Sequence, residues 1–171
     1  MIQDETTVLR PAEDADLGVL MAIRNDLGIQ EMLLSRARPN TAARVSEWIN
    51  RIGADPASVF FVIGEVKTGS AVGFIQATDL DFIDGHGSLG IAIHPDFARR
   101  GHARAAIRLL GSYLHGVFGL RKLTLQVRAD NEAAIALYRS IGFRDVGTWR
   151  DHHRVGDRYV DVLAMEACIV P

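Results

Sequence analysis

The order of strand, turn, helix and strand over residues 88–128 constrains the fold of this chain more than any other feature. Residues 88–95 are apolar and β-rich, a turn with two arginines and a glycine follows, and a helix leads into a second β-rich run at 122–128. A crossover helix carries the chain back to the end of the sheet where the first strand began, so the two strands it joins lie parallel. The sequence therefore predicts an α/β fold with a parallel pair inside its sheet.

The segments around this pair have the patterns of further strands and helices. β-branched and aromatic residues predict strands at 6–10, 58–66, 70–80, 143–155 and 158–170. Apolar residues at helical spacing predict, besides the crossover helix, helices at 11–25, 41–52 and 131–142. The predicted order is β-α-α-β-β-β-α-β-α-β-β, which gives a mixed sheet that is mostly antiparallel and is parallel at the crossover.

Length and composition favour a single domain over residues 1–171. Of these residues 48% are hydrophobic, which is enough for one core. Cys168 has no second cysteine with which to form an internal disulfide, and the first residues lack the apolar segment of a signal peptide. We therefore expect a cytoplasmic protein without a membrane segment, and both a monomer and a homodimer are left open.

Charge is unevenly distributed along the chain. The net charge is −2, which argues against general nucleic-acid binding. Residues 97–129 nevertheless contain no acid and seven basic side chains. Two of these, Arg99 and Arg100, precede Gly101 at the start of the crossover helix, where unpaired backbone N–H groups attract anions. Because glycine has no Cβ to block the backbone, this turn is a predicted phosphate site.

The predicted helix at 131–142 offers a second set of candidate residues. Asn131 and Tyr138 are seven residues apart, so they share one face of the helix, with Ala134 between them. Each has an ordinary structural explanation, since Asn131 can cap the helix and Tyr138 can pack in the core. Together, after a phosphate-binding turn, the amide and the phenol also fit the wall of a binding site.

Other motifs are excluded by their context. The string GHGSLG at 85–90 matches a dinucleotide-binding pattern but leads into a strand rather than a helix. The histidines lack the spacing of metal ligands, so no metal is predicted. Ser112, Ser140 and Cys168 have no setting that would make them nucleophiles.

Acidic side chains ahead of the strand at 88–95 are candidates for binding an amine. Their negative charge would attract a cationic acceptor. A solvated loop is the alternative interpretation of the same residues. The predicted substrate-binding residues are Asp79, Asp81, Asp84 and His86.

The two informative stretches resemble a known family. HPDFARRGHARAAIRLL at 94–110 is similar to motif A of the GNAT N-acetyltransferases, and RADNEAAIALYRSIGF at 128–143 is similar to their motif B, as found in ribosomal-protein N-terminal and small-amine acetyltransferases. The order of predicted elements resembles the GNAT fold over residues 7–166. The resemblance implies direct transfer of an acetyl group from acetyl-CoA to a primary amine. That amine belongs to a small molecule, such as an amino acid or a polyamine, or to a peptide N-terminus.

The resemblance also implies where acetyl-CoA binds. The two parallel strands are expected to splay apart, with the cosubstrate in the gap and its pyrophosphate on the turn after the first strand. Tyr138 would be the catalytic residue that protonates the departing thiolate. The cofactor-binding residues implied in this way are Leu89, Ile91, Ile93, Arg99, Arg100, Gly101, His102, Ala103, Arg104, Asn131, Ala134 and Tyr138.

Two positions depart from the family pattern. Ala98 stands where a glutamine or an arginine usually begins the phosphate-binding turn. Gln126 stands where the N-terminal acetyltransferases carry a glutamate base, twelve residues before Tyr138. An amide cannot accept the proton, so the base lies elsewhere or is a bound water. The alternative to an enzyme is a non-catalytic module that binds acyl-CoA or another phosphate ligand.

Overall fold

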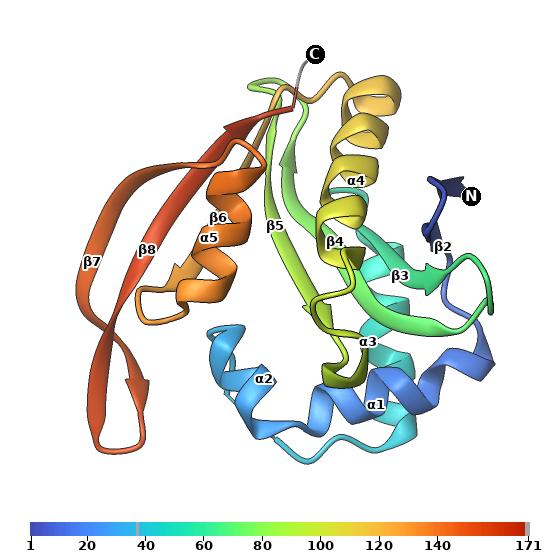
Figure 1. Ribbon diagram of the computed structural model, residues 1–171, viewed down its shortest axis with the longest axis horizontal. Helices are drawn as coiled ribbons and strands as arrows, with labels where there is room; N and C mark the ends of the chain where they lie inside the picture. Colours follow the sequence, from blue (N-terminus) through green and yellow to red (C-terminus); the bar gives the residue numbers. More distant parts are fainter. Residues whose placement is uncertain (37, 170–171) are drawn as a thin grey trace.

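Eight strands form one sheet in the computed structural model, which describes residues 1–36 and 38–169. They follow one another across the sheet in the order β1-β2-β3-β4-β5-β6-β8-β7 (Figure 1). Their bounds are Ile2–Gln3 for β1, Thr7–Arg10 for β2, Val59–Glu65 for β3, Ala71–Asp81 for β4, His86–Ile93 for β5, Lys122–Arg128 for β6, Arg144–Val155 for β7 and Arg158–Cys168 for β8. The expected mixed sheet is confirmed, and Val170 of the last predicted strand lies outside the described residues.

The described residues also form five α-helices, and two short 3-10 turns at Asp14–Asp16 and Pro95–Phe97. The helices are α1 Leu17–Asn25, α2 Leu27–Met32, α3 Ala42–Ala54, α4 His102–Phe118 and α5 Glu132–Ser140. The predicted order of elements is confirmed with two additions, β1 and α2. The helix predicted from Pro11 onward is wrong at its start, because α1 begins only after the first of the 3-10 turns.

Helices cover both faces of the sheet. Successive residues of a strand point to opposite faces, so Phe74 packs with α1 and α3 whereas the next residue, Ile75, packs with α4 and α5. On the first of these faces, Trp48 of α3 meets the rings of Phe60 and Phe74 edge-on, with 5.1 Å between ring centroids in each case. The two apolar clusters therefore fix each helix layer against its own side of the sheet.

The central parallel pair separates soon after it forms. The residue pairs that join β5 to β6 are His86 with Lys122, Gly87 with Leu123, and Ser88 with Thr124. Beyond Ser88, β5 stays paired with β4 on its other side, and β6 stays paired with β8 as far as Arg128. The two ribbons diverge from this point in Figure 1. The expected splay is confirmed, and backbone groups of β5 that a parallel neighbour would pair face the gap instead.

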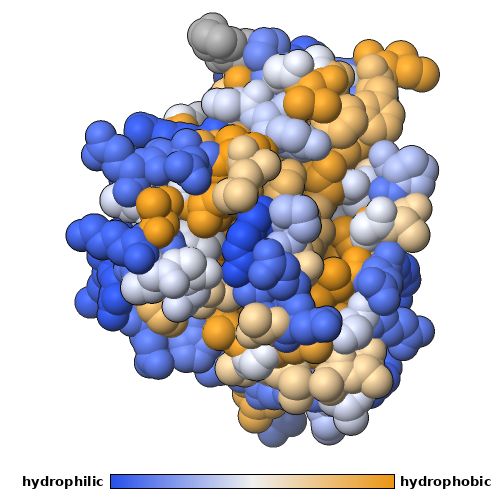
Figure 2. All heavy atoms as spheres, turned by 90° about the vertical axis from the view of Figure 1, so that its right-hand side faces the viewer, coloured by the Kyte–Doolittle hydropathy of each residue, from blue (hydrophilic) through white to orange (hydrophobic). Residues whose placement is uncertain are grey.

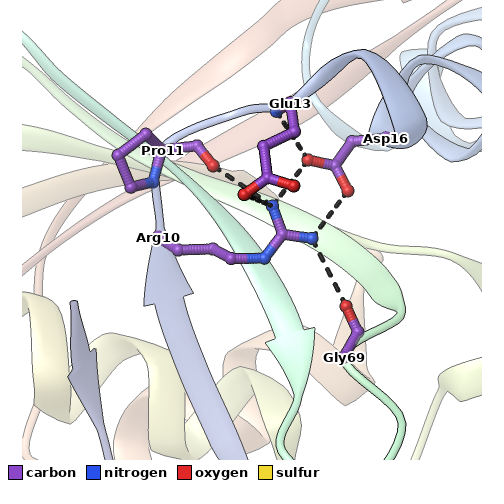
Figure 3. Close-up of polar contacts among 5 residues, drawn as sticks. All are labelled: Arg10, Pro11, Glu13, Asp16 and Gly69. Atoms are coloured by element: carbon purple, nitrogen blue, oxygen red, sulfur yellow. Dashed lines mark hydrogen bonds and ion pairs between the residues drawn. The ribbon is translucent and has the colours of Figure 1, made fainter.

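Arg10 holds the chain at the entry to α1 (Figure 3). Its guanidinium donates to both carboxylate oxygens of Asp16 at 2.7 Å, and to the carbonyl of Gly69 at 3.4 Å. The Asp16 carboxylate also accepts from the backbone N–H of Glu13 at 2.8 Å. Burial alone would raise the pKa of this carboxyl, but the hydrogen bonds from Arg10 and Glu13 outweigh it and hold the pKa below its ordinary value. Residues 11–13 are thereby kept out of the helix.

The surface is mixed in polarity. Hydrophilic and hydrophobic residues are interspersed on the side of the molecule that forms the right-hand edge of Figure 1 (Figure 2). Exposed apolar side chains such as Leu27, Ile83 and Val146 are spread over α2, the β4–β5 turn and β7. Within the described residues, no helix is both long enough and apolar enough to cross a membrane.

Candidate active site

A cavity of about 470 Å³ occupies the gap between β5 and β6. Its walls come from these two strands, from α5, and from the segment that begins at Asp26 and continues through α2. The predicted cofactor-binding residues that line it are Leu89, Ile91, Ile93, Asn131, Ala134 and Tyr138. The structure therefore brings the residues predicted on the strand at 88–95 and on the helix at 131–142 to one site.

A second cavity, of about 400 Å³, adjoins the first and leads to the start of α4. Ile93 and Ala134 line both cavities. The residues of the predicted phosphate turn that line the second cavity are Arg99, Gly101, His102, Ala103 and Arg104. We call the two cavities together the β5–β6 groove. It has an apolar strand wall at one end and a helix N-terminus at the other.

The turn before α4 presents backbone N–H groups that no side chain caps. Arg99 and Gly101 both have positive φ, at 62° and 89°, and Gly101 is the N-cap of α4 without a side-chain hydrogen bond. The backbone N–H of Ala105 donates to the carbonyl of Gly101 at 3.1 Å, which closes the first helical turn. The N–H groups of residues 102–104 precede that bond, so they have no intrahelical partner and are oriented to bind an anion.

Two side chains of the turn anchor it to the rest of the fold. His102 is 4% exposed, and its Nδ1 lies 2.9 Å from Thr7 Oγ1 on β2. Arg104 donates to Ser140 Oγ at 2.7 Å and so connects α4 with the end of α5. The His102 side chain therefore points into the core, and only its backbone N–H is available to a ligand in the groove.

The two arginines at the start of the turn point in different directions. Arg100 turns back to donate to the carbonyl of Asp96 at 2.8 Å, and its guanidinium lies 5.1 Å from the centre of the Phe97 ring. Arg100 does not line either cavity, whereas Arg99 lines the second one. Of the pair, Arg99 is thus the side chain placed to neutralise an anion at the α4 N-terminus.

α5 faces the strand wall with an amide and a phenol. Asn131 Oδ1 accepts from the backbone N–H of Ala134 at 3.3 Å, so Asn131 caps α5 and also lines the cavity. Tyr138 packs against Phe143 with 5.6 Å between ring centroids. Burial raises the pKa of Tyr138 to about 12. The phenol is therefore protonated at neutral pH and is a donor of hydrogen bonds or of a proton.

Gln126 and Asp26 supply polar groups to the same cavity. Gln126 is exposed on β6, and its amide is not a base. Asp26 is the one carboxylate among the residues that line this cavity, and its Oδ1 accepts from the backbone N–H of Ile29 at 2.9 Å as the N-cap of α2. Sequence reasoning missed Asp26 and the wall that α2 forms, although an aspartate before LGIQEM is itself a helix-start signal.

The four residues predicted to bind the acceptor lie elsewhere. Asp81, Asp84 and His86 are at the β4–β5 turn, where β5 is still paired with β6, and none of them lines the groove. Asp79 has φ of 53° beside an irregularity in the β4–β5 register, and it accepts from the hydroxyl of Thr78 at 3.1 Å. The structure therefore does not bring these acids to the groove.

The same turn gathers possible metal-ligating atoms. One such atom from each of Asp81, Asp84 and His86 lies within 4.8 Å of the other two. Asp81 Oδ1 already accepts from the N–H groups of Asp84 and Ile83, at 2.8 and 2.9 Å, and these hydrogen bonds lower the pKa of Asp81. A short Asx turn accounts for this arrangement, and the absence of a bound metal stays a prediction.

The splayed parallel pair and the uncapped N-terminus of α4 are the features of an α/β acyltransferase. The chain matches the acetyltransferase (GNAT) domain over residues 7–144. It belongs to this family, as the resemblance of its two motifs implies, and it is an N-acyltransferase. An unrelated phosphate-binding module, the alternative considered for the sequence, is thereby ruled out.

Individual relatives differ in how much of the chain they match. The spermidine N(1)-acetyltransferase of Vibrio cholerae is 25% identical over 157 residues, which cover 92% of this chain and 90% of that one. The [ribosomal protein bS18]-alanine N-acetyltransferase of Salmonella typhimurium is 40% identical over 75 residues, 44% of this chain and 50% of that one. The crystal structure of the Vibrio cholerae spermidine N-acetyltransferase with CoA and spermine has a TM-score of 0.88, at 24% identity and 96% coverage of both chains.

Proposed function

We propose that the protein transfers an acetyl group from acetyl-CoA directly to the primary amine of a small molecule, such as an amino acid or a polyamine. The observation that carries the proposal is the groove from the β5–β6 gap to the uncapped N-terminus of α4. Such a groove suits a carrier with an acyl group at one end and phosphates further along. A peptide N-terminus is the second acceptor class, and the partial match to a ribosomal-protein acetyltransferase supports it.

The residues of the groove fit acetyl-CoA. The N–H groups of residues 102–104 and the guanidinium of Arg99 would hold the pyrophosphate by charge-assisted hydrogen bonds. Ile91 and Asn131, on opposite walls, would contact the pantetheine arm. A Cβ added at Gly101 meets no protein atom within 4 Å, so the space beside this glycine is open to a ligand.

The reaction needs a proton donor and an electrophilic carbonyl. Bound acetyl-CoA supplies an activated acetyl group, to which the amine nitrogen forms a bond while the carbon–sulfur bond breaks. Tyr138 Oη holds the proton that the departing sulfur takes up. A backbone N–H of β5 that the splay leaves without a partner on β6 would polarise the acetyl oxygen. Both groups belong to rigid elements, so they are positioned before the substrates arrive.

The raised pKa of Tyr138 is compatible with this role. Proton transfer from a phenol of pKa about 12 to a thiolate of pKa near 8.5 is unfavourable by about 5 kcal/mol. A turnover of about 10 per second corresponds to a barrier of about 16 kcal/mol, so the step fits within it. The burial that raises the pKa of the phenol also raises the pKa of a thiol in the same cavity. The pKa difference between the proton donor and the proton acceptor is therefore smaller than these values give.

The acceptor end of the groove is assigned to Asp26 and α2. A carboxylate at Asp26 would attract a cationic amine, and the apolar side chains of Ile29 and Met32 would contact its carbon chain. Gln126 can orient the amine by hydrogen bonding but cannot take its proton. The proton therefore leaves through water or through Asp26. A single carboxylate favours an acceptor with one cationic group at this end.

The test combines a substrate screen with a change at Tyr138. Release of free thiol from acetyl-CoA is measured with amino acids, polyamines, aminoglycosides and short peptides as acceptors. For the best acceptor, Tyr138→Phe should lower kcat at least tenfold and leave the Kd for CoA within twofold. Tyr113→Phe is the control, because Tyr113 packs against Phe61 and Phe118 and does not line the groove. A fully active Tyr138→Phe variant would exclude the phenol as the proton donor.

A further inference from the structure

A third cavity, of about 380 Å³, lies between α1, α3 and the loop that joins α2 to α3. None of its lining residues lines the β5–β6 groove, so the two sites are separate. We call it the arginine cavity. Its walls include Arg24, Arg36, Arg38, Arg44, Arg51 and Trp48.

The positive charge of the arginine cavity is not neutralised by the protein. Glu47 is the one acid among its lining residues, against five arginines. In the part of the chain that the structure describes, none of the five guanidinium groups lies within 4.0 Å of a carboxylate oxygen. Several arginines elsewhere are paired with a carboxylate, as Arg10 is with Asp16 at 2.7 Å and Arg150 with Asp161 at 2.6 Å. Convergence of unpaired like charges raises the free energy of the empty site.

Arg24 shows most clearly that a partner is missing. Its guanidinium lies over the ring of Trp48, 4.7 Å from the ring centre. Its Nε is buried and has no hydrogen-bond partner among the described residues. Burial, and after it the charge of Arg51, lowers the pKa of Arg24. A buried N–H donor without an acceptor is unfavourable, and an anion beside the rest of the Arg24 guanidinium would offset part of this effect through its charge.

The cavity is held in shape without a ligand. Asn40, in the loop before α3, donates through Nδ2 to the carbonyl of Arg24 at 2.9 Å. Its backbone N–H donates to Asn25 Oδ1 at 2.8 Å, and Asn25 Nδ2 donates back to its carbonyl at 3.0 Å. Arg44 donates to the carbonyl of Pro39 at 3.1 Å. These bonds fasten the loop to the end of α1 and to the start of α3, so that arginines from three segments converge on one space.

We propose that the arginine cavity binds a phosphate chain, either inorganic or as the polyphosphate of a nucleotide. Guanidinium groups bind phosphate oxygens through paired hydrogen bonds, and several of them together favour a multiply charged oxyanion over a single phosphate. Trp48 offers no open ring face, because it is 9% exposed and Arg24 covers one side. The ligand is therefore recognised by its phosphates and not by stacking of a base.

The experiment measures binding of inorganic tripolyphosphate by calorimetry and by thermal unfolding, with saturating CoA present to fill the groove. Sodium chloride at equal ionic strength is the salt control. We expect binding and stabilisation by tripolyphosphate, similar binding of ATP, and weaker binding of AMP. The double variant Arg44→Gln/Arg51→Gln should weaken tripolyphosphate binding at least tenfold. Arg44 and Arg51 are exposed, so the variant should fold.

The control variant is Arg108→Gln, which removes a positive charge on α4, remote from the cavity. Its tripolyphosphate affinity should equal that of the wild type. The proposal is overturned if tripolyphosphate does not bind, if the double variant binds it as well as the wild type does, or if Arg108→Gln weakens binding to the same extent. Binding of single-stranded RNA that the double variant loses, without binding of tripolyphosphate, would also overturn it and identify a nucleic-acid surface instead.

Discussion

Replacing Gly101 with alanine tests the phosphate turn, and the same replacement at Gly119 provides a matched control. These glycines flank α4 and have φ of 89° and 69°. A Cβ at either position meets no protein atom within 4 Å. The two substitutions therefore strain the free protein in the same way, but only Gly101 lines the groove.

The size of each effect follows from this geometry. A residue with a Cβ in the left-handed region costs about 1–2 kcal/mol, and a loss of 1 kcal/mol lowers the Tm of a domain of this size by about 2–4 °C. At Gly101 the methyl group would also occupy the space beside the N–H groups of residues 102–104. Loss of one hydrogen bond to a charged group weakens binding by about 1.5–3 kcal/mol, which is about 10- to 150-fold in Kd.

The assay is calorimetric titration with CoA, together with thermal unfolding in its presence and absence. We expect both variants to lose a similar amount of stability without CoA. Only Gly101→Ala should lose CoA affinity, and with it the rise in Tm that a bound ligand produces. If the two variants bind CoA equally well, the phosphates do not sit at this turn and the assignment of the groove is refuted.

Two further predictions concern individual carboxylates. The folded-state pKa of Asp16 is lowered, so the stabilisation by its carboxylate is complete above the ordinary pKa near 4 and is lost as the pH falls through the folded-state value. Asp16→Asn should therefore reduce the unfolding free energy at pH 7 by about 2 kcal/mol, a deficit that shrinks below about pH 4. Urea unfolding measures it, with the exposed Asp14→Asn as the control; a deficit that does not depend on pH would contradict the reasoning. Asp26→Asn preserves an N-cap for α2 and should raise the KM for a cationic amine about tenfold, which corresponds to one lost charge contact, without changing the KM for acetyl-CoA. Equal changes in the KM for the amine and the KM for acetyl-CoA would show that Asp26 does not bind the acceptor.

The central part of the fold was predictable from sequence because its signals are local and strong. The apolar run before His94, the glycine at 101 and the periodic apolar face of α4 together predict a crossover. The parallel β5–β6 pair follows from that crossover alone. The start of α3 also has a local signal, since Thr41 Oγ1 accepts from the N–H of Arg44 at 3.3 Å as the N-cap.

α2 was missed because its apolar pattern is too short to identify a helix from sequence. It has six residues, of which Gln30 is the buried one and Leu27 is 67% exposed. Ile29 is partly buried against the apolar cluster that α1 and α3 form, and α2 packs beside α1, so tertiary contacts set its place in the fold. A short helix of this kind depends on tertiary contacts, because helix nucleation is unfavourable and six residues add too few hydrogen bonds to offset it.

The acids at the β4–β5 turn were assigned to the acceptor because they precede the cofactor strand in the chain. Because β5 is extended, closeness in sequence to this strand does not by itself place a residue beside the groove. His86 and Ile93 are at its two ends, about 23 Å apart at 3.3 Å per residue. The groove begins near the middle of the strand and continues past Ile93. The acids are therefore at the closed end of the splay.

β5 and β6 are hydrogen-bonded only near one end. The sheet therefore consists of a five-strand part and a three-strand part that are joined along a short stretch. α4, which lies outside the plane of the sheet, connects the two parts along the chain. A ligand bound between β5 and β6 contacts both parts of the sheet. The rigidity of the centre of the protein therefore depends on whether a ligand is bound there.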